Sequence, residues 1–542
     1  MVLKNSINFI NSFFLYIYNI LRKIYLNSSI YNNKISKINY RILNYKPSLS
    51  LLGCIIKYEK KKKKIEDFYL NSIWKNNQLN EKDFKKLHSF FWLFSLDLKS
   101  SKKTTHSIIL NWIDNNKKYN QKSWETDVLS KRVISWISNS QLTYEDGDED
   151  YKEKFNFMIN KQINHLINEI SRSKLVDDKM IGCTAIILTG LSYNDKKILD
   201  FGINLLKKIS SFSFDTSGFP KSRGIRQLTF YLKYFVLIRE LLKESQKEIP
   251  EYLNENIYYL GQAYNFIWQS TKSNFLFNGN HDSDHSDFDN YLKNQGYKFK
   301  GNLNEFGGYA ILKNKNFRLI MDLGSSPEKK FSTNYQSGPL SFEIFYKGIK
   351  LITNSGYFQN IKHQLNDISR STAAHSTLTV DNNSISRFKK SVNGISQIEK
   401  GFKIIKKNII SEDLFWSLKG SHDGYQKKYG IIHERTIEFY PEKNKFIGLD
   451  KLIKKKNFKS SNFEIRFHLM PNAKVTKTQE GKSVLIELEN SGWRFFCKDH
   501  KLDVETGLYF GKKNSYTENQ NIFITGISQK DDQEIRWEIS KI

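Results

Sequence analysis

The segment Arg370–Asn382, with the sequence RSTAAHSTLTVDN, places a histidine five residues after an arginine. Small and hydroxyl side chains flank His375, so its imidazole would have room to exchange a proton with a ligand. The planar guanidinium of Arg370 suits a carboxylate, because it can donate two parallel hydrogen bonds. The segment therefore predicts that these side chains face an acidic ligand. A buried, hydrogen-bonded histidine that only supports the architecture is the alternative.

A second block, Ser337–Asn354, has the sequence SGPLSFEIFYKGIKLITN and comes shortly before the first. Both blocks alternate apolar and polar residues, which is typical of half-buried strands, and His375 would then lie at the mouth of a strand. Glu343 interrupts the apolar pattern of this block, as Asp381 does in the other. Glu343 could contact a ligand, or it could form a structural ion pair with an arginine.

The elements that must position these residues change character along the chain. Between about 66 and 270, apolar residues recur at spacings of three and four, as in Ile163, Leu166, Ile167 and Ile170. This pattern predicts many helices in succession, paired antiparallel in an α-solenoid or toroid. After about 290, short alternating segments such as FRLIMDLG and EIRWEIS follow one another, which predicts stacked antiparallel sheets.

We therefore expect an α and β multidomain protein in three parts. These are an amphipathic or irregular segment (1–65), a helical toroid (66–280) and a β-sandwich (291–542). The junction His281–Asp289, HDSDHSDFD, lacks the glycine and terminal glutamate of a calcium loop. It is interpreted as a flexible acidic linker, with a metal site as the alternative.

The composition favours anionic partners. Lys and Arg total 85 against 56 Asp and Glu, which gives a formal charge of +29. This excess favours nucleic acid, an anionic membrane or an acidic polysaccharide, although an AT-rich codon bias toward Lys, Asn and Ile would also produce it. The run Lys60–Lys64 is interpreted as a solvated end of an element. No nucleic-acid-binding motif is present, so specific nucleic-acid binding is not expected.

The cysteines and the first residues add little that is specific. Cys54, Cys183 and Cys497 lie far apart and form neither a zinc pattern nor a disulfide framework, so no metal and no cofactor are predicted. Residues 1–26 are apolar and aromatic but interrupted by Asn and Ser. They make a poor signal peptide and a poor membrane span, and they predict an amphipathic helix in peripheral contact with a membrane.

Several blocks together resemble the heparinase II/III-like family of polysaccharide lyases, in its bacterial branch. Leu340–Glu343 (LSFE) and Arg370–Thr377 (RSTAAHST) match the family's most specific motifs. The resemblance extends to SHDGYQ, HER, GLD and FEIRFHL further along, and to WETDVLSKRVISW and LFNGN before them. It covers nearly the whole chain after about residue 65, and implies an N-terminal (α/α) toroid followed by an antiparallel β-sandwich.

The resemblance implies cleavage of a uronate-containing polysaccharide by β-elimination. That reaction needs donors that neutralise the uronate carboxylate, a base that removes the C5 proton, and an acid that protonates the leaving oxygen. The implied catalytic residues are His375 and Tyr335. The implied substrate-binding residues are Arg223, Arg226, Gln336, Glu343, Arg370 and His422.

The chain departs from the family in two places. The family often carries a metal-binding His-x-His-x-Asp pattern just before LSFE, where this chain has 335–339, YQSGP, so that metal site is not expected. In the loop Phe214–Gln227, which loosely resembles the family's Asp-Gly-Gly-His-x-x-Arg-Ser-Pro loop, Phe219 replaces the histidine. If Arg223 is the family's arginine, Gly224 and Ile225 replace Ser and Pro.

Two functions remain open from the sequence. The first is a lyase-like enzyme acting on an acidic polysaccharide or glycan of the cell envelope or periplasm. The second is a carbohydrate-binding protein that kept the fold and the arginines but lost the acid–base set. The identity of the sugar, the oligomeric state and a cytoplasmic location are left open. If the chain is an enzyme, we expect Arg223, Gln336, Arg370 and His375 to converge on one cleft between the toroid and the sheet.

Overall fold

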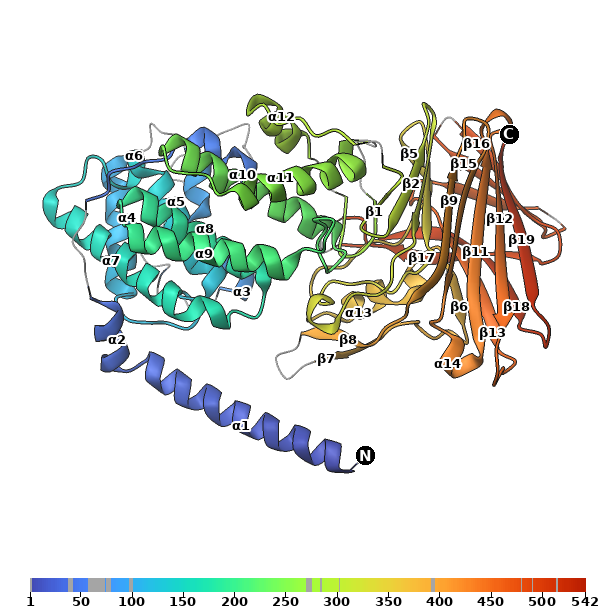
Figure 1. The fold of residues 1–542 in the computed structure, drawn as a ribbon, viewed down its shortest axis with the longest axis horizontal. Helices are drawn as coiled ribbons and strands as arrows, with labels where there is room; N and C mark the ends of the chain where they lie inside the picture. Colours follow the sequence, from blue (N-terminus) through green and yellow to red (C-terminus); the bar gives the residue numbers. More distant parts are fainter. Residues whose placement is uncertain are drawn as a thin grey trace. The chain divides into compact units, whose positions relative to one another are not determined.

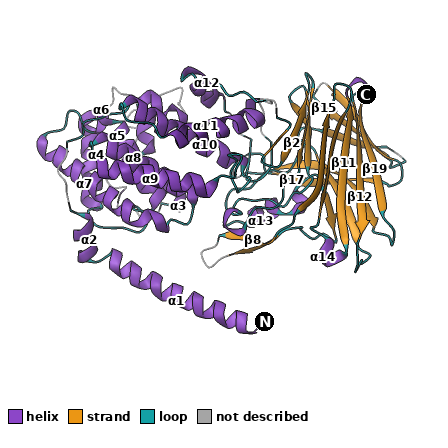
Figure 2. Cartoon of the chain, viewed as in Figure 1, coloured by secondary structure: helices purple, strands orange, loops and turns teal. Residues whose placement is uncertain are grey.

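The computed structural model separates helices from strands along the chain. It describes residues 2–37, 42–56, 74, 79–96, 101–269, 275–282, 285–301, 303–390, 395–478, 480–489, 491–512 and 515–542. The chain forms two compact units. The helical unit comprises 1–212, 231–257 and 286–297, and the sheet unit comprises 213–230, 258–285 and 298–542. Figures 1 and 2 show helices along the N-terminal half of the chain and strands along the C-terminal half.

Most of the helices occupy the region between about 66 and 270, where the apolar spacing predicts them. They are α1 (Val2–Leu26), α2 (Ser29–Ile35), α3 (Glu81–His88), α4 (Lys102–Asn115), α5 (Thr126–Ser138), α6 (Ser140–Thr143), α7 (Glu149–Glu169), α8 (Val176–Ser192), α9 (Lys196–Ser213), α10 (Ile225–Glu244), α11 (Glu251–Tyr264) and α12 (Ser286–Asn294). Side chains that accept from a backbone N–H fix several starts, as Ser101 does for α4 and Asp148 for α7. Lys60–Lys64 lies outside the described residues.

Large aromatic side chains form the core of the helical unit. The rings of Trp112 and Trp136 meet edge to face with centroids 5.5 Å apart, and Phe90 packs on Trp136 at 5.3 Å. Arg132 is buried among them, and its guanidinium donates to Gln162 Oε1 and to the carbonyl of His88, each at 2.8 Å. Because burial disfavours the charged form, the pKa of Arg132 lies well below its ordinary value.

Strands form four sheets in the sheet unit, and every pairing between the described strands is antiparallel. The strand orders are β1-β2-β3-β4-β5, β14-β15-β16-β19-β12-β11-β10-β9, β17-β18-β13-β6 and β7-β8. The strands are β1 (Glu305–Phe306), β2 (Tyr309–Lys313), β3 (Phe317–Asp322), β4 (Phe342–Tyr346), β5 (Ile349–Ile352), β6 (Leu378–Val380), β7 (Arg387–Lys390), β8 (Ser396–Lys400), β9 (Ile404–Ser411), β10 (Trp416–His422), β11 (Ile431–Tyr440), β12 (Lys445–Lys454), β13 (Asn462–His468), β14 (Lys474–Lys477), β15 (Ser483–Leu488), β16 (Ser491–Cys497), β17 (Leu502–Tyr509), β18 (Thr517–Ile527) and β19 (Gln533–Lys541).

The prediction of a strand throughout Arg370–Asn382 is wrong for most of that segment. Arg370 ends a short helix, α13 (Gln364–Arg370), and Thr372–Ala374 forms a 3-10 turn before β6 begins. Arg370 and His375 are buried and bond to backbone carbonyl groups, whereas Asp381 is exposed. His375 therefore lies in irregular backbone ahead of the strand.

A large apolar cluster fills much of the sheet unit, with Trp537 of β19 among its buried residues. Phe342 stacks on Trp537 with centroids 5.5 Å apart, and Phe467 packs edge to face at 4.9 Å. Gly448 of β12 lies under the same indole, and a Cβ at that position would collide with the ring. The segment GLD therefore needs its glycine for packing.

A buried polar network crosses the largest sheet at Asp450 of β12. Its carboxylate accepts from Arg435 Nε at 2.7 Å, from Arg435 Nη2 at 3.0 Å, from His433 Nε2 at 2.6 Å and from Trp537 Nε1 at 2.8 Å. Burial alone would raise the pKa of Asp450, but Arg435 and His433 outweigh it and hold the pKa well below the usual range. The carboxylate is therefore a fixed negative charge inside the sheet.

Arg435 also holds the two sequence blocks together. Its Nη1 donates to the carbonyl of Leu340 at 3.1 Å and to that of Ser376 at 2.7 Å. Leu340 opens the LSFE block and Ser376 belongs to RSTAAHST, so one guanidinium fixes the backbones of both. The segments HER and GLD supply the arginine and its carboxylate.

We predict that Asp450→Asn destabilises the protein by about 3–5 kcal/mol, because it leaves the buried Arg435 charge without its counter-ion. Urea unfolding followed by circular dichroism measures the change. Glu534→Gln is the matched control, since its pair with Lys451 is half-exposed and should contribute less than about 1 kcal/mol. Equal stability of Asp450→Asn and wild type would contradict the role given to this network.

Candidate functional site

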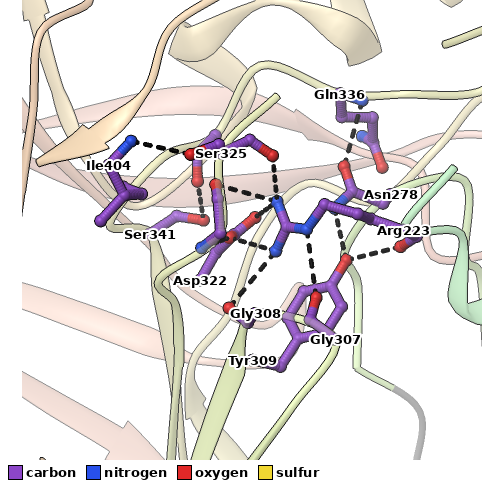
Figure 3. Close-up of polar contacts among 12 residues, drawn as sticks. Arg223, Asn278, Gly307, Gly308, Tyr309, Asp322, Ser325, Gln336, Ser341 and Ile404 are labelled. Atoms are coloured by element: carbon purple, nitrogen blue, oxygen red, sulfur yellow. Dashed lines mark hydrogen bonds and ion pairs between the residues drawn. The ribbon is translucent and has the colours of Figure 1, made fainter. Parts of the chain in front are cut away.

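Arg223 is the centre of a polar network at the edge of the sheet unit (Figure 3). Its Nη2 lies 2.6 Å from Asp322 Oδ1, and its Nε and Nη1 donate to the carbonyls of Gly307 at 3.1 Å and Gly324 at 3.0 Å. Burial disfavours the charged guanidinium, but Asp322, Tyr309 and Tyr335 outweigh it and raise the pKa of Arg223. The side chain predicted to bind substrate is thus bonded to protein groups.

The local sequence explains why the loop folds onto the sheet. Asp215 accepts from the backbone N–H groups of Ser217 and Phe219, each at 2.9 Å, which closes the turn before Pro220. Phe219, which stands at the family's histidine, is fully buried and packs on Phe306 with centroids 5.8 Å apart. An apolar contact therefore takes the place of a proton-transfer group.

Gln336 is also bonded on all sides. Its Oε1 accepts from the N–H of Gly279 at 3.0 Å, and its Nε2 donates to the carbonyls of Gly356 at 2.9 Å and Ser369 at 2.7 Å. Its backbone N–H donates to Asn278 Oδ1, and Asn278 in turn bonds the Tyr309 hydroxyl. Gln336 thus joins the chain segments around Arg223 and offers no amide atom to a ligand.

Arg370 and Tyr335 are buried together. Arg370 donates to the backbone carbonyls of Tyr335 and Ser332, each at 2.8 Å, and of Ser396 at 3.2 Å. Its guanidinium lies 4.0 Å from the ring centroid of Phe388, and burial lowers its pKa. Burial raises the pKa of the Tyr335 phenol well above its ordinary value, so the hydroxyl keeps its proton.

His375 is a neutral imidazole. It is 1% exposed, and burial lowers its pKa to about 4. Its Nδ1 lies 2.9 Å from the carbonyl oxygen of Ser371, which can only accept, so Nδ1 carries the proton and Nε2 keeps its lone pair. Gly338 packs against the ring, and a Cβ there would approach the ring to 2.5 Å.

Glu343 pairs with a lysine, contrary to the expected pairing with an arginine. Its Oε1 accepts from the N–H groups of Leu276 at 3.2 Å and Asn354 at 3.0 Å and from Thr353 Oγ1 at 3.1 Å. The ammonium of Lys350 lies 3.9 Å from Oε2. Burial raises the pKa of Glu343 above its ordinary value.

His422 and His433 lie opposite each other on β10 and β11, fully buried. Since Asp450 accepts from His433 Nε2, His433 Nδ1 must accept from His422 Nε2, 3.2 Å away. His422 Nδ1 then accepts from the N–H of Gly424 at 3.1 Å. Both imidazoles extend the Asp450 network, and neither faces a groove or the solvent.

The structure thus buries the predicted residues other than Arg226 within the sheet unit, and Arg223 also lines an open groove. Arg223, Gln336, Glu343, Arg370 and His422 each bond to protein groups, and their roles toward a substrate stay predictions. Arg226, in the first turn of α10, is the exposed member of the set.

An open groove lies beside the Arg223 network, with a volume of about 590 Å³. Lys221, Lys406 and Lys407 line it together with Phe331 and Ser326. Lys407 is paired with Glu305, whereas Lys406 lies on the exposed edge strand β9. No motif predicts this groove, because IIKKNIIS matches none and lysines are frequent throughout the chain.

The interpretation of His281–Asp289 as a flexible linker is wrong in part, because residues 286–289 begin helix α12, and His281 and Asp282 are bonded to protein groups. His281 Nδ1 lies 2.7 Å from Gln359 Nε2, and Asp282 accepts from the Tyr509 hydroxyl at 2.7 Å. Residues 283–284 lie outside the described residues. Within the described part of the chain, no group of three or more His, Cys, Asp or Glu side chains is arranged to hold a metal ion.

The fold is that of the heparinase III structures. The crystal structure of heparinase III matches with a TM-score of 0.68 and 14% identity, covering 94% of this chain and 88% of that one. A heparan sulfate lyase HepC mutant from Pedobacter heparinus matches with a TM-score of 0.66 and 14% identity, covering 94% and 85%. The predicted fold class, an (α/α) toroid followed by a β-sandwich, is confirmed.

Residues 302–538 match the family model "Heparinase II/III-like, C-terminal". This match over the C-terminal part of the chain agrees with the family that the motif blocks predict. A curated relative, FtsZ-localized protein C of Caulobacter vibrioides, is 26% identical over 251 residues. That match covers 43% of this chain and 42% of the relative, so less than half of the relative's length is matched.

We predict that Arg223→Met destabilises the protein by about 3–5 kcal/mol, because Asp322 would remain as a buried, unpaired carboxylate. Asp322→Asn should cost a similar amount, and the double variant should cost clearly less than the sum. Urea unfolding of all three variants measures this coupling. The same cycle on the exposed pair Lys474–Glu487 is the control, and its coupling energy should be less than about 1 kcal/mol. Additive effects of the Arg223 and Asp322 substitutions would contradict the prediction.

We also predict that His375 makes the protein less stable in acid. Its pKa is about 4 in the folded state against an ordinary 6.5, so its contribution is complete above pH 6.5 and is lost as the pH falls toward 4. At pH 5 the loss is about 2 kcal/mol. The His375→Gln variant should lack this part of the pH dependence of unfolding. A His375 imidazole signal that titrates near 6.5 by NMR would disprove it.

Proposed function

We propose that this protein binds an acidic polysaccharide through its sheet unit, and that most of the predicted lyase residues serve the fold. The family and the heparinase III-like fold support a polysaccharide ligand. The formal charge of +29 supports an acidic one, because a polyanion gains from many exposed cations at once.

One observation carries the choice of binding over cleavage. Arg223 and Arg370 are the two arginines that would neutralise a uronate carboxylate. Arg223 instead donates hydrogen bonds to Asp322, and Arg370 donates to backbone carbonyls. A carboxylate that replaced these partners would leave buried groups unpaired, which costs more than an exposed ion pair returns. The C5 proton of the sugar would then lack the polarisation that β-elimination needs.

The groove beside Arg223 offers an alternative set of contacts. Lys406 and Lys407 present ammonium groups on β9, and the ammonium groups of Lys221 and Lys330 lie over the ring of Phe331, 5.8 and 5.0 Å from its centroid. The groove also contains Glu305 and Glu328, which are paired with Lys407 and Lys330. The lining therefore suits a chain of mixed hydroxyl and acidic groups better than a densely charged one.

Cleavage by β-elimination is the second candidate, and one feature of His375 favours it. The imidazole is neutral and keeps a lone pair on Nε2, which is the form that a base requires. Its low pKa makes it a weak base, and the buried Tyr335 is a poor acid partner. Cleavage would therefore be slow unless the site opens on binding.

We predict binding without turnover on a panel of uronate polymers that includes heparan sulfate. Isothermal titration should detect binding that weakens with salt, and the Arg226→Ala/Lys406→Ala variant should bind about three- to tenfold more weakly. Lys443→Ala, at an exposed site in the turn before β12, is the matched control and should bind as wild type does.

Ultraviolet absorbance of a new C4–C5 double bond is measured in the same samples. A product signal that His375→Ala abolishes would establish the lyase and overturn the binding-only proposal. Absence of both binding and product across the panel would reject an acidic polysaccharide as the ligand. Location at the cell envelope or periplasm remains a prediction that fits such a ligand.

A further inference from the structure

Helix α1 exposes an unusual number of large apolar side chains. Among its described side chains, Phe14 is 66% exposed, Leu21 60% and Ile24 63%. The other exposed members are Phe13, Tyr16, Ile17, Tyr18, Ile20 and Tyr25. Exposed apolar surface of this kind marks a site that a membrane or another molecule covers.

The end of α1 is fixed to the helical unit. Leu26 is buried, and the Tyr25 ring packs edge to face on Tyr31 of α2 with centroids 5.1 Å apart. Tyr31 bonds His165 of α7 at 2.8 Å, and Arg22 pairs with Glu169 of the same helix. These contacts hold the last turns of α1, while the described side chains just before them, such as Phe14, are exposed.

The charges of α1 are of one sign. The helix contains Lys4, Arg22 and Lys23 and no Asp or Glu. Of its nine Asn, Ser and basic positions, eight (4, 5, 8, 11, 12, 19, 22 and 23) fall within about a third of the helix circumference by helical spacing, and Ser6 falls outside it. The remaining positions are mostly Ile, Leu, Phe and Tyr. No described helix, α1 included, is long and apolar enough to cross a membrane.

We propose that α1 lies in the surface of an anionic lipid bilayer and holds the protein there. A wide apolar side bearing Phe and Tyr, a narrower polar side and basic residues without acidic ones match an interfacial helix. A lipid surface accepts aromatic and branched side chains without a complementary shape, and its negative charge attracts a chain of formal charge +29. This inference is independent of the polysaccharide proposal, since it concerns the helical unit alone.

The test is co-sedimentation of the full chain with vesicles of phosphatidylcholine containing phosphatidylglycerol. The α1 variant is Phe14→Gln/Leu21→Gln/Ile24→Gln, because glutamine keeps helix propensity while removing the apolar surface. The control variant is Leu414→Gln/Tyr516→Gln/Ile527→Gln, which removes side chains that are 63%, 56% and 61% exposed in the sheet unit.

We expect wild type and the control variant to bind the vesicles, and the α1 variant to bind at least tenfold more weakly. Binding should fall on pure phosphatidylcholine and should decrease only in part at high salt, since apolar insertion does not depend on charge. Equal binding by the α1 variant, or no binding by wild type, would overturn the proposal. Light scattering of the lipid-free proteins measures self-association. If wild type does not bind vesicles but self-associates, and the α1 variant loses this self-association, α1 contacts a second copy of the chain and the proposal is overturned.

Discussion

The charge pair between Asp450 and Arg435 is the contact on which the sheet unit depends. It lies in fully buried surroundings, where each charge would be costly alone. The arginine then uses its remaining donors to hold the carbonyls of Leu340 and Ser376, which belong to segments far apart in the sequence. His433 and Trp537 donate further hydrogen bonds to the Asp450 carboxylate, so strands β11, β12 and β19 are joined by one buried hydrogen-bond network.

The same principle recurs at Arg223 and Arg370. Arg223 anchors the loop that precedes α10 to β1, β2 and β3 through Asp322 and the carbonyls around it. Arg370 anchors the segment before His375 to Ser332 and Ser396. In each case a planar guanidinium with several donors holds irregular backbone that lacks the regular hydrogen bonds of a β-sheet. Buried arginines in this protein thus connect separate loops by hydrogen bonds to their backbone carbonyls.

The fold could be predicted well from the sequence, and the site only in part. Apolar spacing is a local property, so it identifies the helices of 101–269 and strands such as β3, β11 and β19 directly. Asp322 and Asp450 carry no signal of their own, because their partners are 99 and 15 residues away and only the folded sheet brings them together. Desolvation, which decides whether His375 is a base or a support, is likewise a property of the packed structure.

Because of these buried bonds, the presence of the motifs in this chain does not by itself indicate that the chain catalyses a reaction. LSFE, RSTAAHST, HER and GLD meet at Arg435, so a substitution in any of them would first disturb the sheet. Purifying selection for folding alone would then keep all four, even in a lineage that no longer cut sugar chains. The motifs would outlast the reaction, and a descendant with a new task would still carry the signature of a lyase.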